Sequence, residues 1–227
     1  GGWIFTPSTA LSQAAHVITA KATDAVGNVS SASTAITLTI DTTAPGQPTI
    51  STLGTATNNT KLPIAGSAEA NSTVTVYDGT SILGTTTASS SGGWIFTPST
   101  ALSQAAHVIT VKAKDAAGNV SMASSSITLT VDTTAPTAPA ITTKTGALNN
   151  NKPTITGTAE KGSIVTVYDG STSLGTTTAS STGAWSFTPS TALSQAAHVI
   201  TAKATDAAGN GSSASTAITL TIDTTAP

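Results

Sequence analysis

Hydrophobic and polar residues alternate over short stretches of this chain. Residues 127–131 read Ile-Thr-Leu-Thr-Val, and residues 74–76 follow the same two-residue period. Alternation in stretches rich in Val, Ile and Thr is typical of half-buried β-strands, and no stretch has a convincing helical period. Between residues 46 and 136 the pattern predicts strands near 48–51, 62–67, 72–77, 82–88, 93–97, 107–114 and 125–131.

Residues that favour turns separate these predicted strands. They include Asn58-Asn59, Asp78-Gly79, Ser91-Gly92-Gly93 and Gly118-Asn119. Seven short strands within about 90 residues, with a turn every 8–12 residues, are typical of an immunoglobulin-like sandwich. The sequence therefore predicts an all-β fold built from seven-stranded Ig-like β-sandwich domains.

The same pattern recurs along the chain. Trp3, Trp94 and Trp185 are 91 residues apart, and the string Asp-Thr-Thr-Ala-Pro begins at positions 41, 132 and 223 with the same spacing. A repeat of this length suits a self-contained domain that is repeated end to end. We therefore predict the C-terminal half of a repeat at 1–45 and complete repeats at 46–136 and 137–227.

Differences between the repeats predict which side chains face the core. Trp94 and Phe96 recur in the next repeat, whereas serine replaces the intervening Ile95. The aromatic pair is therefore expected to point inward and Ile95 outward. In the sixth predicted strand the same alternation points Ile109, Val111 and Ala113 inward, and Lys112 and Lys114 outward.

Composition narrows the classes of function. Only 8% of the 227 residues are charged, the formal net charge is -2, and all eight basic residues are scattered lysines. Nucleic-acid binding through counterion release needs clustered cations, so nucleic acid is not an expected partner. No apolar run approaches the roughly 20 residues of a membrane helix, so this segment is not expected to insert into a membrane. The absence of cysteine excludes disulfides and thiol chemistry.

Three strings carry a resemblance to a known family. They are Gly-Trp-Ile-Phe-Thr-Pro at 93–98, Val-Lys-Ala-Lys-Asp-Ala-Ala-Gly-Asn at 111–119, and Asp-Thr-Thr-Ala-Pro at 132–136. In this order they resemble the bacterial Ig-like tandem repeats of giant biofilm-associated (BapA-type or RTX) surface adhesins. The resemblance implies export from a Gram-negative cell and a long stalk that carries a distal adhesive tip. In several members of that family, calcium at the domain junctions stiffens the stalk.

Acidic residues from separate loops are expected to meet at each junction. Alternating strand directions bring Asp41, Glu69 and Asp115 to the pole where the linker enters the second repeat. Calcium takes about 6–8 oxygen ligands at 2.3–2.6 Å, so a calcium site is predicted here, in part from the resemblance. The alternative is that Asp41 and Asp115 hold turns through Asx-type hydrogen bonds while Glu69 is solvated. The predicted set at the next junction is Asp132, Glu160 and Asp206.

The remaining candidates favour structural roles. Asp78 and Asp169 precede glycine at the opposite pole, where Asp-Gly favours a hairpin turn. His16, His107 and His198 recur once per repeat and are expected to be partly exposed residues at the start of a strand. A catalytic histidine needs an orienting acid and a nucleophile, so no enzymatic activity is predicted. The threonine-rich strands are expected to face solvent rather than to bind ice or sugar.

The repeat pattern predicts a structural segment, and the resemblance implies that it lies outside the cell, at the bacterial surface. Its expected partners are the neighbouring repeats, with a host or abiotic surface contacted through other regions of the protein. Proline in the Thr-Thr-Ala-Pro linker restricts the backbone between repeats. Two other functions stay open: a module whose loops bind a glycan or host protein, and an accessory domain of a secreted enzyme or phage fibre.

Overall fold

A computed structural model describes residues 2–226 as strands and connecting segments, without a helix. Consequently, the described chain offers no helix of the length and apolarity needed to cross a membrane. The backbone groups into two compact units. One comprises the chain up to Thr52 with Pro63–Phe96 and Ile109–Ser126, and the other comprises Leu53–Leu62, Thr97–Val108 and the chain from Ile127 onward.

The first repeat contributes one pair of strands. β1 (Ala15–Ile18) and β2 (Ile36–Thr39) pair antiparallel, with His16 opposite Leu38. Most of their side chains are exposed, including Val17, Ile36 and Leu38. These strands correspond to Ala106–Lys114 and Ile127–Val131 of the next repeat, but their apolar side chains are largely exposed.

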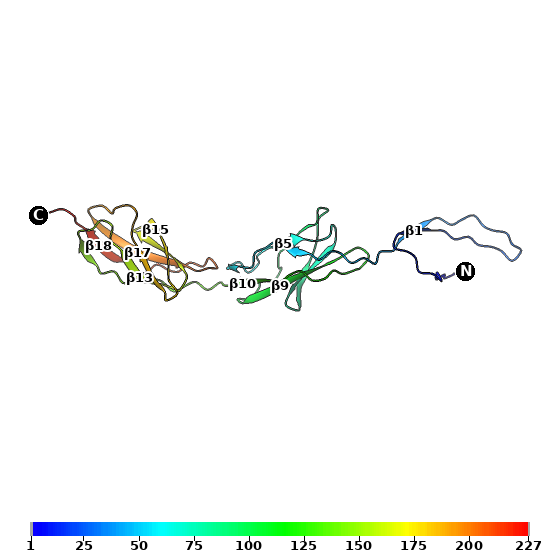
Figure 1. Ribbon diagram of the computed structural model, residues 1–227, viewed down its shortest axis with the longest axis horizontal. Helices are drawn as coiled ribbons and strands as arrows, with labels where there is room; N and C mark the ends of the chain where they lie inside the picture. The colour runs from blue at the N-terminus through cyan, green and yellow to red at the C-terminus, as the bar shows by residue number, and fades with distance from the viewer. Residues whose placement is uncertain (1, 227) are drawn as a thin grey trace. The chain divides into compact units, whose positions relative to one another are not determined.

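The second repeat forms a three-stranded and a five-stranded sheet. The sheet orders are β3-β5-β8 and β4-β10-β9-β6-β7, and Figure 1 labels several of these strands. Their bounds are β3 (Thr49–Ile50), β4 (Ala56–Thr57), β5 (Ile64–Ser67), β6 (Thr73–Asp78), β7 (Ser81–Thr87), β8 (Gly93–Phe96), β9 (Ala106–Lys114) and β10 (Ile127–Val131).

The third repeat has the same two sheets, ordered β11-β13-β16 and β12-β18-β17-β14-β15. This repetition confirms the predicted all-β class of Ig-like sandwiches in tandem. The bounds are β11 (Ala140–Ile141), β12 (Gly146–Leu148), β13 (Ile155–Thr158), β14 (Ile164–Asp169), β15 (Thr172–Thr178), β16 (Ala184–Phe187), β17 (Ala197–Thr205) and β18 (Ile218–Ile222).

One short strand differs from the prediction in each complete repeat. The stretch 48–51 was expected to be the only strand before residue 62, but β4 follows it and pairs parallel with β10. In the third repeat β12 likewise pairs parallel with β18. These strands are two and three residues long, which is too short for a two-residue period to be recognisable.

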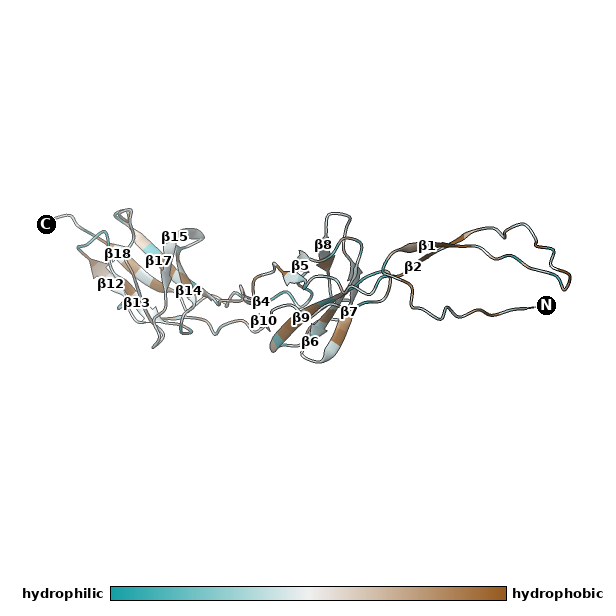
Figure 2. Ribbon diagram, turned by 45° about the vertical axis from the view of Figure 1, so that its right-hand side comes forward, coloured by the Kyte–Doolittle hydropathy of each residue, from teal (hydrophilic) through white to brown (hydrophobic). Residues whose placement is uncertain are grey.

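The core follows the predicted alternation. Trp94 and Phe96 are 3% and 8% exposed, whereas Ile95 is 66% exposed. In β9, which is largely hydrophobic in Figure 2, every second residue from His107 to Ala113 is buried. Lys114 is exposed and Lys112 is half-buried. The core cluster of the third repeat contains Ile155, Val165, Val167, Ala179, Trp185, Phe187, Ile200, Ala202 and Leu220.

A glycine allows the tryptophan to lie against the three-stranded sheet. A Cβ at Gly157 would lie 2.1 Å from the carbonyl oxygen of Ala140 and 2.5 Å from Cζ2 of Trp185. Both distances are far below contact, and one of them involves backbone that cannot move aside. The close approach of β11 to β13 at Trp185 therefore depends on glycine at this position.

We expect Gly157→Ala to destabilise the third repeat by about 1–3 kcal/mol, because the added methyl group overpacks against β11 and Trp185. Denaturant unfolding, with hydrogen exchange to assign the change to this repeat, measures the loss. Gly211→Ala is the matched control, because a Cβ there meets no atom within 4 Å. Equal stability of the two variants would contradict the packing role of Gly157.

Candidate functional site

The loop after β9 is held by a carboxylate and an amide four residues apart. Oδ1 of Asp115 accepts the backbone N–H groups of Gly118 at 2.7 Å and Asn119 at 2.8 Å. Oδ2 accepts the side-chain amide of Asn119 at 2.8 Å. The bond from the Asn119 side chain, together with these backbone bonds, outweighs desolvation and lowers the pKa of Asp115. The loop is therefore a closed Asx-type turn.

The same amide of Asn119 reaches the linker that precedes the second repeat. Its Nδ2 also donates to the backbone carbonyl of Asp41 at 3.0 Å, across 78 residues of chain. An Asn side-chain nitrogen carries two protons, so both bonds can form together. Asp115 fixes one N–H of the Asn119 amide, so the other N–H has a defined direction. This second N–H connects the loop to the linker.

The second linker is held in the same way. Nδ2 of Asn210 donates to Oδ2 of Asp206 and to the carbonyl of Asp132, both at 2.8 Å. A further bond runs from the backbone N–H of Asn58 to the carbonyl of Ala208 at 3.1 Å. Partial burial acts to raise the pKa of Asp206, but the bonds from Asn210 and the turn backbone lower it overall. The arrangement therefore recurs with an added contact.

The first repeat contains the same loop. Oδ2 of Asp24 accepts the amide of Asn28 at 2.7 Å, and Oδ1 accepts the backbone N–H of Asn28 at 2.8 Å. The pKa of Asp24 is lowered, chiefly by these bonds with Asn28. The bonds between the aspartate and the asparagine four residues later therefore recur in all three repeats.

The linkers are also anchored by their own residues. Oδ1 of Asp41 accepts the N–H of Thr43 at 2.9 Å, and the hydroxyl of Thr42 donates to Gln13 at 2.8 Å. Pro45 is buried, as is Pro136 in the second linker. Proline removes backbone freedom, and burial fixes where it sits. Each linker is thus tied to the repeat before it and to the repeat after it.

The structure connects two of the three predicted metal ligands at each junction. Asp115 and Asp41 meet through Asn119, and Asp206 and Asp132 meet through Asn210. Glu69 and Glu160 are exposed, and their backbone carbonyls accept serine hydroxyls at 2.7 Å.

The carboxylates of the predicted calcium sites are bonded within turns or exposed to solvent. Among residues 2–226 no three or more His, Asp or Glu side chains lie close enough together to hold a metal ion. The carboxylate of Asp115 already accepts three N–H groups. These contacts match the Asx-turn alternative for Asp115 and Asp206, and calcium stays a prediction.

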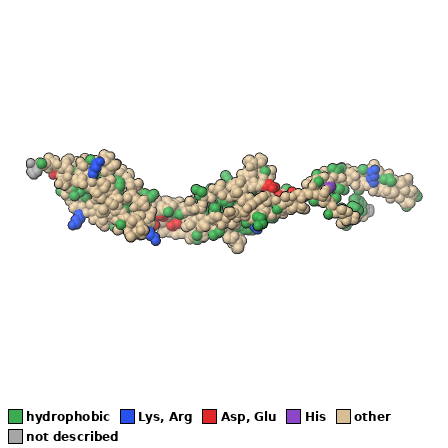
Figure 3. Space-filling view, viewed as in Figure 1, with side chains coloured by type: hydrophobic (Ala, Val, Ile, Leu, Met, Phe, Trp, Pro, Cys, Tyr) green, Lys and Arg blue, Asp and Glu red, His purple; other side chains and the backbone are tan. Residues whose placement is uncertain are grey.

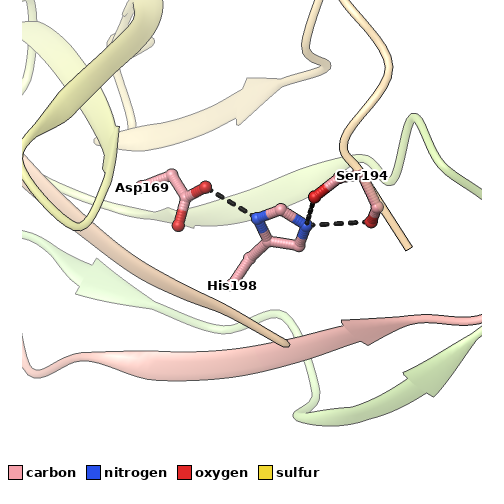
Figure 4. Close-up of polar contacts among 3 residues, drawn as sticks. All are labelled: Asp169, Ser194 and His198. Atoms are coloured by element: carbon pink, nitrogen blue, oxygen red, sulfur yellow. Dashed lines mark hydrogen bonds and ion pairs between the residues drawn. The ribbon is translucent and has the colours of Figure 1, made fainter. Parts of the chain in front are cut away.

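A second polar cluster lies in the third repeat. Nδ1 of His198 lies 2.6 Å from Oδ2 of Asp169, and Nε2 lies 3.0 Å from the carbonyl oxygen of Ser194 (Figure 4). His198 is 7% exposed, so the expectation of a partly exposed histidine was wrong for this copy and for the buried His107. Asp169, predicted as a turn residue, has an additional partner because β14 pairs with β17.

This cluster contains serine, histidine and aspartate, and its shortest contacts join His198 to Asp169 and to a backbone carbonyl. A carbonyl and a carboxylate only accept hydrogen bonds, so a protonated His198 ring donates from Nδ1 to Asp169 and from Nε2 to the Ser194 carbonyl. The Ser194 hydroxyl lies farther from Nε2, at 3.4 Å. Burial acts to lower the pKa of His198, but the bonds to Ser194 and Asp169 raise it overall.

Comparison with known proteins agrees with the repeat pattern. The model of the bacterial Ig-like domain matches residues 1–42, 49–133 and 140–224. Exoglucanase B of Cellulomonas fimi is 34% identical over 97% of this chain, which spans only 21% of that enzyme's length.

One solved structure shares the fold at low sequence identity. Fibronectin(III)-like modules of Clostridium thermocellum CbhA are 18% identical, with a TM-score of 0.52 over 78% of this chain and 94% of that one. A tetra-tandem repeat from the extending region of a large adhesion protein is 23% identical. The match covers 93% of this chain and 57% of the adhesion-protein chain, at a TM-score of 0.35.

The His198 cluster should make the third repeat more stable in mildly acidic solution. A raised folded-state pKa gives stabilisation that is fully present below the ordinary value of 6.5 and is lost as the pH rises through the folded pKa. NMR titration of the ring should give a midpoint above 6.5. Asp169→Asn should lower that midpoint and remove on the order of 1 kcal/mol of stability at acidic pH. An unchanged midpoint in Asp169→Asn would contradict the ion pair.

Proposed function

Because the chain belongs to the bacterial Ig-like domain family, we propose that it is a spacer segment of a long exported bacterial protein. The Ig-like sandwich is a non-catalytic module type, and its function lies in what its loops and ends contact. The observation that carries the proposal is the bond from Asn119 to the Asp41 carbonyl and its repetition from Asn210 to the Asp132 carbonyl. Each repeat thereby holds the linker that precedes it.

The spacer acts by restricting the linkers. One hydrogen bond contributes about 0.5–1.5 kcal/mol, so a single junction bond biases the linker without locking it. Buried prolines and the Asp41 and Thr42 contacts add to the restriction. A junction of this kind yields under load and reforms, because the loop that carries the donor is folded on its own.

More specifically, we propose that the chain is part of the stalk of a surface adhesin, outside the cell. The three motifs around Trp94, Asp115 and Asp132 support it, because their order resembles repeats of giant biofilm-associated adhesins. Neighbouring repeats are then the direct partners, and a distal tip elsewhere in the protein contacts a host or abiotic surface. Few charged side chains lie on the face shown in Figure 3, which suits an inert spacer better than a charged binding surface.

A second candidate is a spacer within a secreted hydrolase. The similarity to Exoglucanase B covers nearly the whole chain, at 34% identity, and supports this alternative. The junction acts identically in both settings, since it depends only on adjacent repeats. The sequence of the flanking protein distinguishes them: a catalytic domain favours the hydrolase, and a long further array of repeats favours the adhesin.

Removing both junction donors should make the chain more flexible. In Asn119→Ala/Asn210→Ala we expect small-angle scattering to show a broader, more flexible profile, with about 0.5–1.5 kcal/mol of coupling lost per junction. Asn28→Ala is the matched control, because among residues 2–226 Asn28 makes the same intra-loop bond but no bond to a linker. If the double variant scatters like the control, the junction bonds do not restrict the linkers.

The calcium prediction is tested on the glutamates, whose side chains take no part in the Asx-type turns. If calcium binds at the junctions, its addition at about a hundred times its Kd should stabilise the chain by about 2.7 kcal/mol, and excess chelator should reverse this. Glu69→Gln/Glu160→Gln should abolish the effect while leaving the calcium-free stability unchanged. A thermal unfolding curve that is the same with calcium and with chelator would rule out these sites.

A further inference from the structure

One of the three junction asparagines has a reactive neighbour. Asn210 is followed by Gly211, whereas Asn28 and Asn119 are followed by valine. Asparagine is a thermolabile residue. Its side-chain carbonyl carbon can be attacked by the backbone nitrogen of the next residue, and a following glycine hinders this attack least because it has no Cβ. The three loops therefore share a geometry but differ in chemical stability.

The backbone around Gly211 leaves the attacking nitrogen available. The flanking bonds run from the N–H of Asp206 to the carbonyl of Asn210 and from the N–H of Ser212 to the carbonyl of Ala204. Gly211 itself is exposed, and its N–H makes no hydrogen bond among residues 2–226. A Cβ placed on it meets no atom within 4 Å, so the space around it is open.

The side chain that must be attacked is held in place. Nδ2 of Asn210 is bonded at 2.8 Å both to Asp206 and to the linker carbonyl of Asp132. Attack requires the amide group to turn toward the Gly211 nitrogen, and that motion breaks these bonds. We propose that Asn210 is a site of spontaneous deamidation whose reaction is gated by opening of the junction between the second and third repeats.

The reaction needs only water as a co-reactant. The Gly211 nitrogen loses its proton and bonds to Cγ of Asn210, which closes a succinimide ring. Nδ2 takes up the proton and leaves as ammonia. Water then opens either carbonyl of the ring, giving aspartate or isoaspartate at position 210. No oxidation or reduction takes place, and the net change is the replacement of an amide by a carboxylate.

The product cannot rebuild the junction. A carboxylate at position 210 has no N–H to donate to the carbonyl of Asp132, and it places a negative charge beside Asp206. Isoaspartate also adds a methylene to the backbone of the turn. Deamidation therefore converts a reversible opening into a permanent loss of the contact; this consequence rests on the proposed spacer function, whereas the reaction itself does not.

The third repeat has one other sequence in which Asp or Asn precedes Gly, and its contacts protect it from ring formation. Asp169 precedes Gly170 and could form the same ring, but the N–H of Gly170 donates to the carbonyl of Val199 at 2.8 Å. The Asp169 carboxylate is paired with His198. The Gly170 N–H and the Asp169 carboxylate are therefore both held by other partners. For this reason ring formation is expected at Asn210 rather than at Asp169.

Peptide mapping by mass spectrometry of the intact chain, aged in mildly alkaline buffer, tests the proposal. We expect conversion of Asn210 to aspartate and isoaspartate several-fold faster than conversion of Asn119, which serves as an internal control. Gly211→Val reproduces the sequence after Asn119 and should lower the rate at Asn210 to that of Asn119. Equal rates at the two asparagines in the unaltered chain would overturn the site.

The gating is tested by weakening the hold on the amide. Asp206→Ala should accelerate the reaction at Asn210, and each tenfold increase corresponds to about 1.4 kcal/mol of closure lost. Asp206→Asn, which keeps a side-chain oxygen for the turn, is the second variant if the first disturbs the fold, as judged by hydrogen exchange across β17. An unchanged rate in a folded variant would overturn the gating. Mass spectrometry measures deamidation of Asn210, whereas small-angle scattering measures the flexibility of the linkers. A failure of the deamidation proposal can therefore be distinguished from a failure of the spacer function.

Discussion

The junctions depend on one local interaction, the pairing of an aspartate with the asparagine four residues later. In all three copies the carboxylate accepts both the backbone N–H and the side-chain amide of that asparagine. The bond closes within a single turn, so little loop-closure entropy opposes it. Only when the amide is fixed in this way does its second proton point at a linker carbonyl. A short-range contact thereby organises one that spans 78 residues.

This use of the carboxylate bears on the acidic residues at the junction. The charge of Asp115 or Asp206 is stabilised inside its own loop by N–H donors, and the pKa of each is lowered accordingly. Such a carboxylate needs no cation to be stable. Repulsion among the acids at each junction is also weak, because Glu69 and Glu160 are exposed and solvated. The hydrogen bonds therefore account for the observed contacts without a metal ion.

The sequence predicted the fold better than the site, for a physical reason. Burial in a sheet has a two-residue period, so the inward Trp94 and outward Ile95 could be read from alternation. Loop positions follow from strand direction, and the structure has Asn119, in the loop of Asp115, donate to the carbonyl of Asp41. Whether their carboxylates converge depends on side-chain orientation, which alternation does not encode. The pairing of Asp169 with His198 was missed because it requires the register of β14 against β17.

Repetition of geometry does not imply repetition of chemistry. The junction bonds of Asn119 and Asn210 have the same partners and nearly the same lengths, 3.0 and 2.8 Å to the linker carbonyl. Their strength is set by these contacts, but their lifetime is set by the residue that follows, Val120 or Gly211. Both residues fit, because position 211 has open space for a side chain. The stiffness of a junction and its durability are therefore separate properties, and a single substitution outside the hydrogen-bonded pair can change the second without the first.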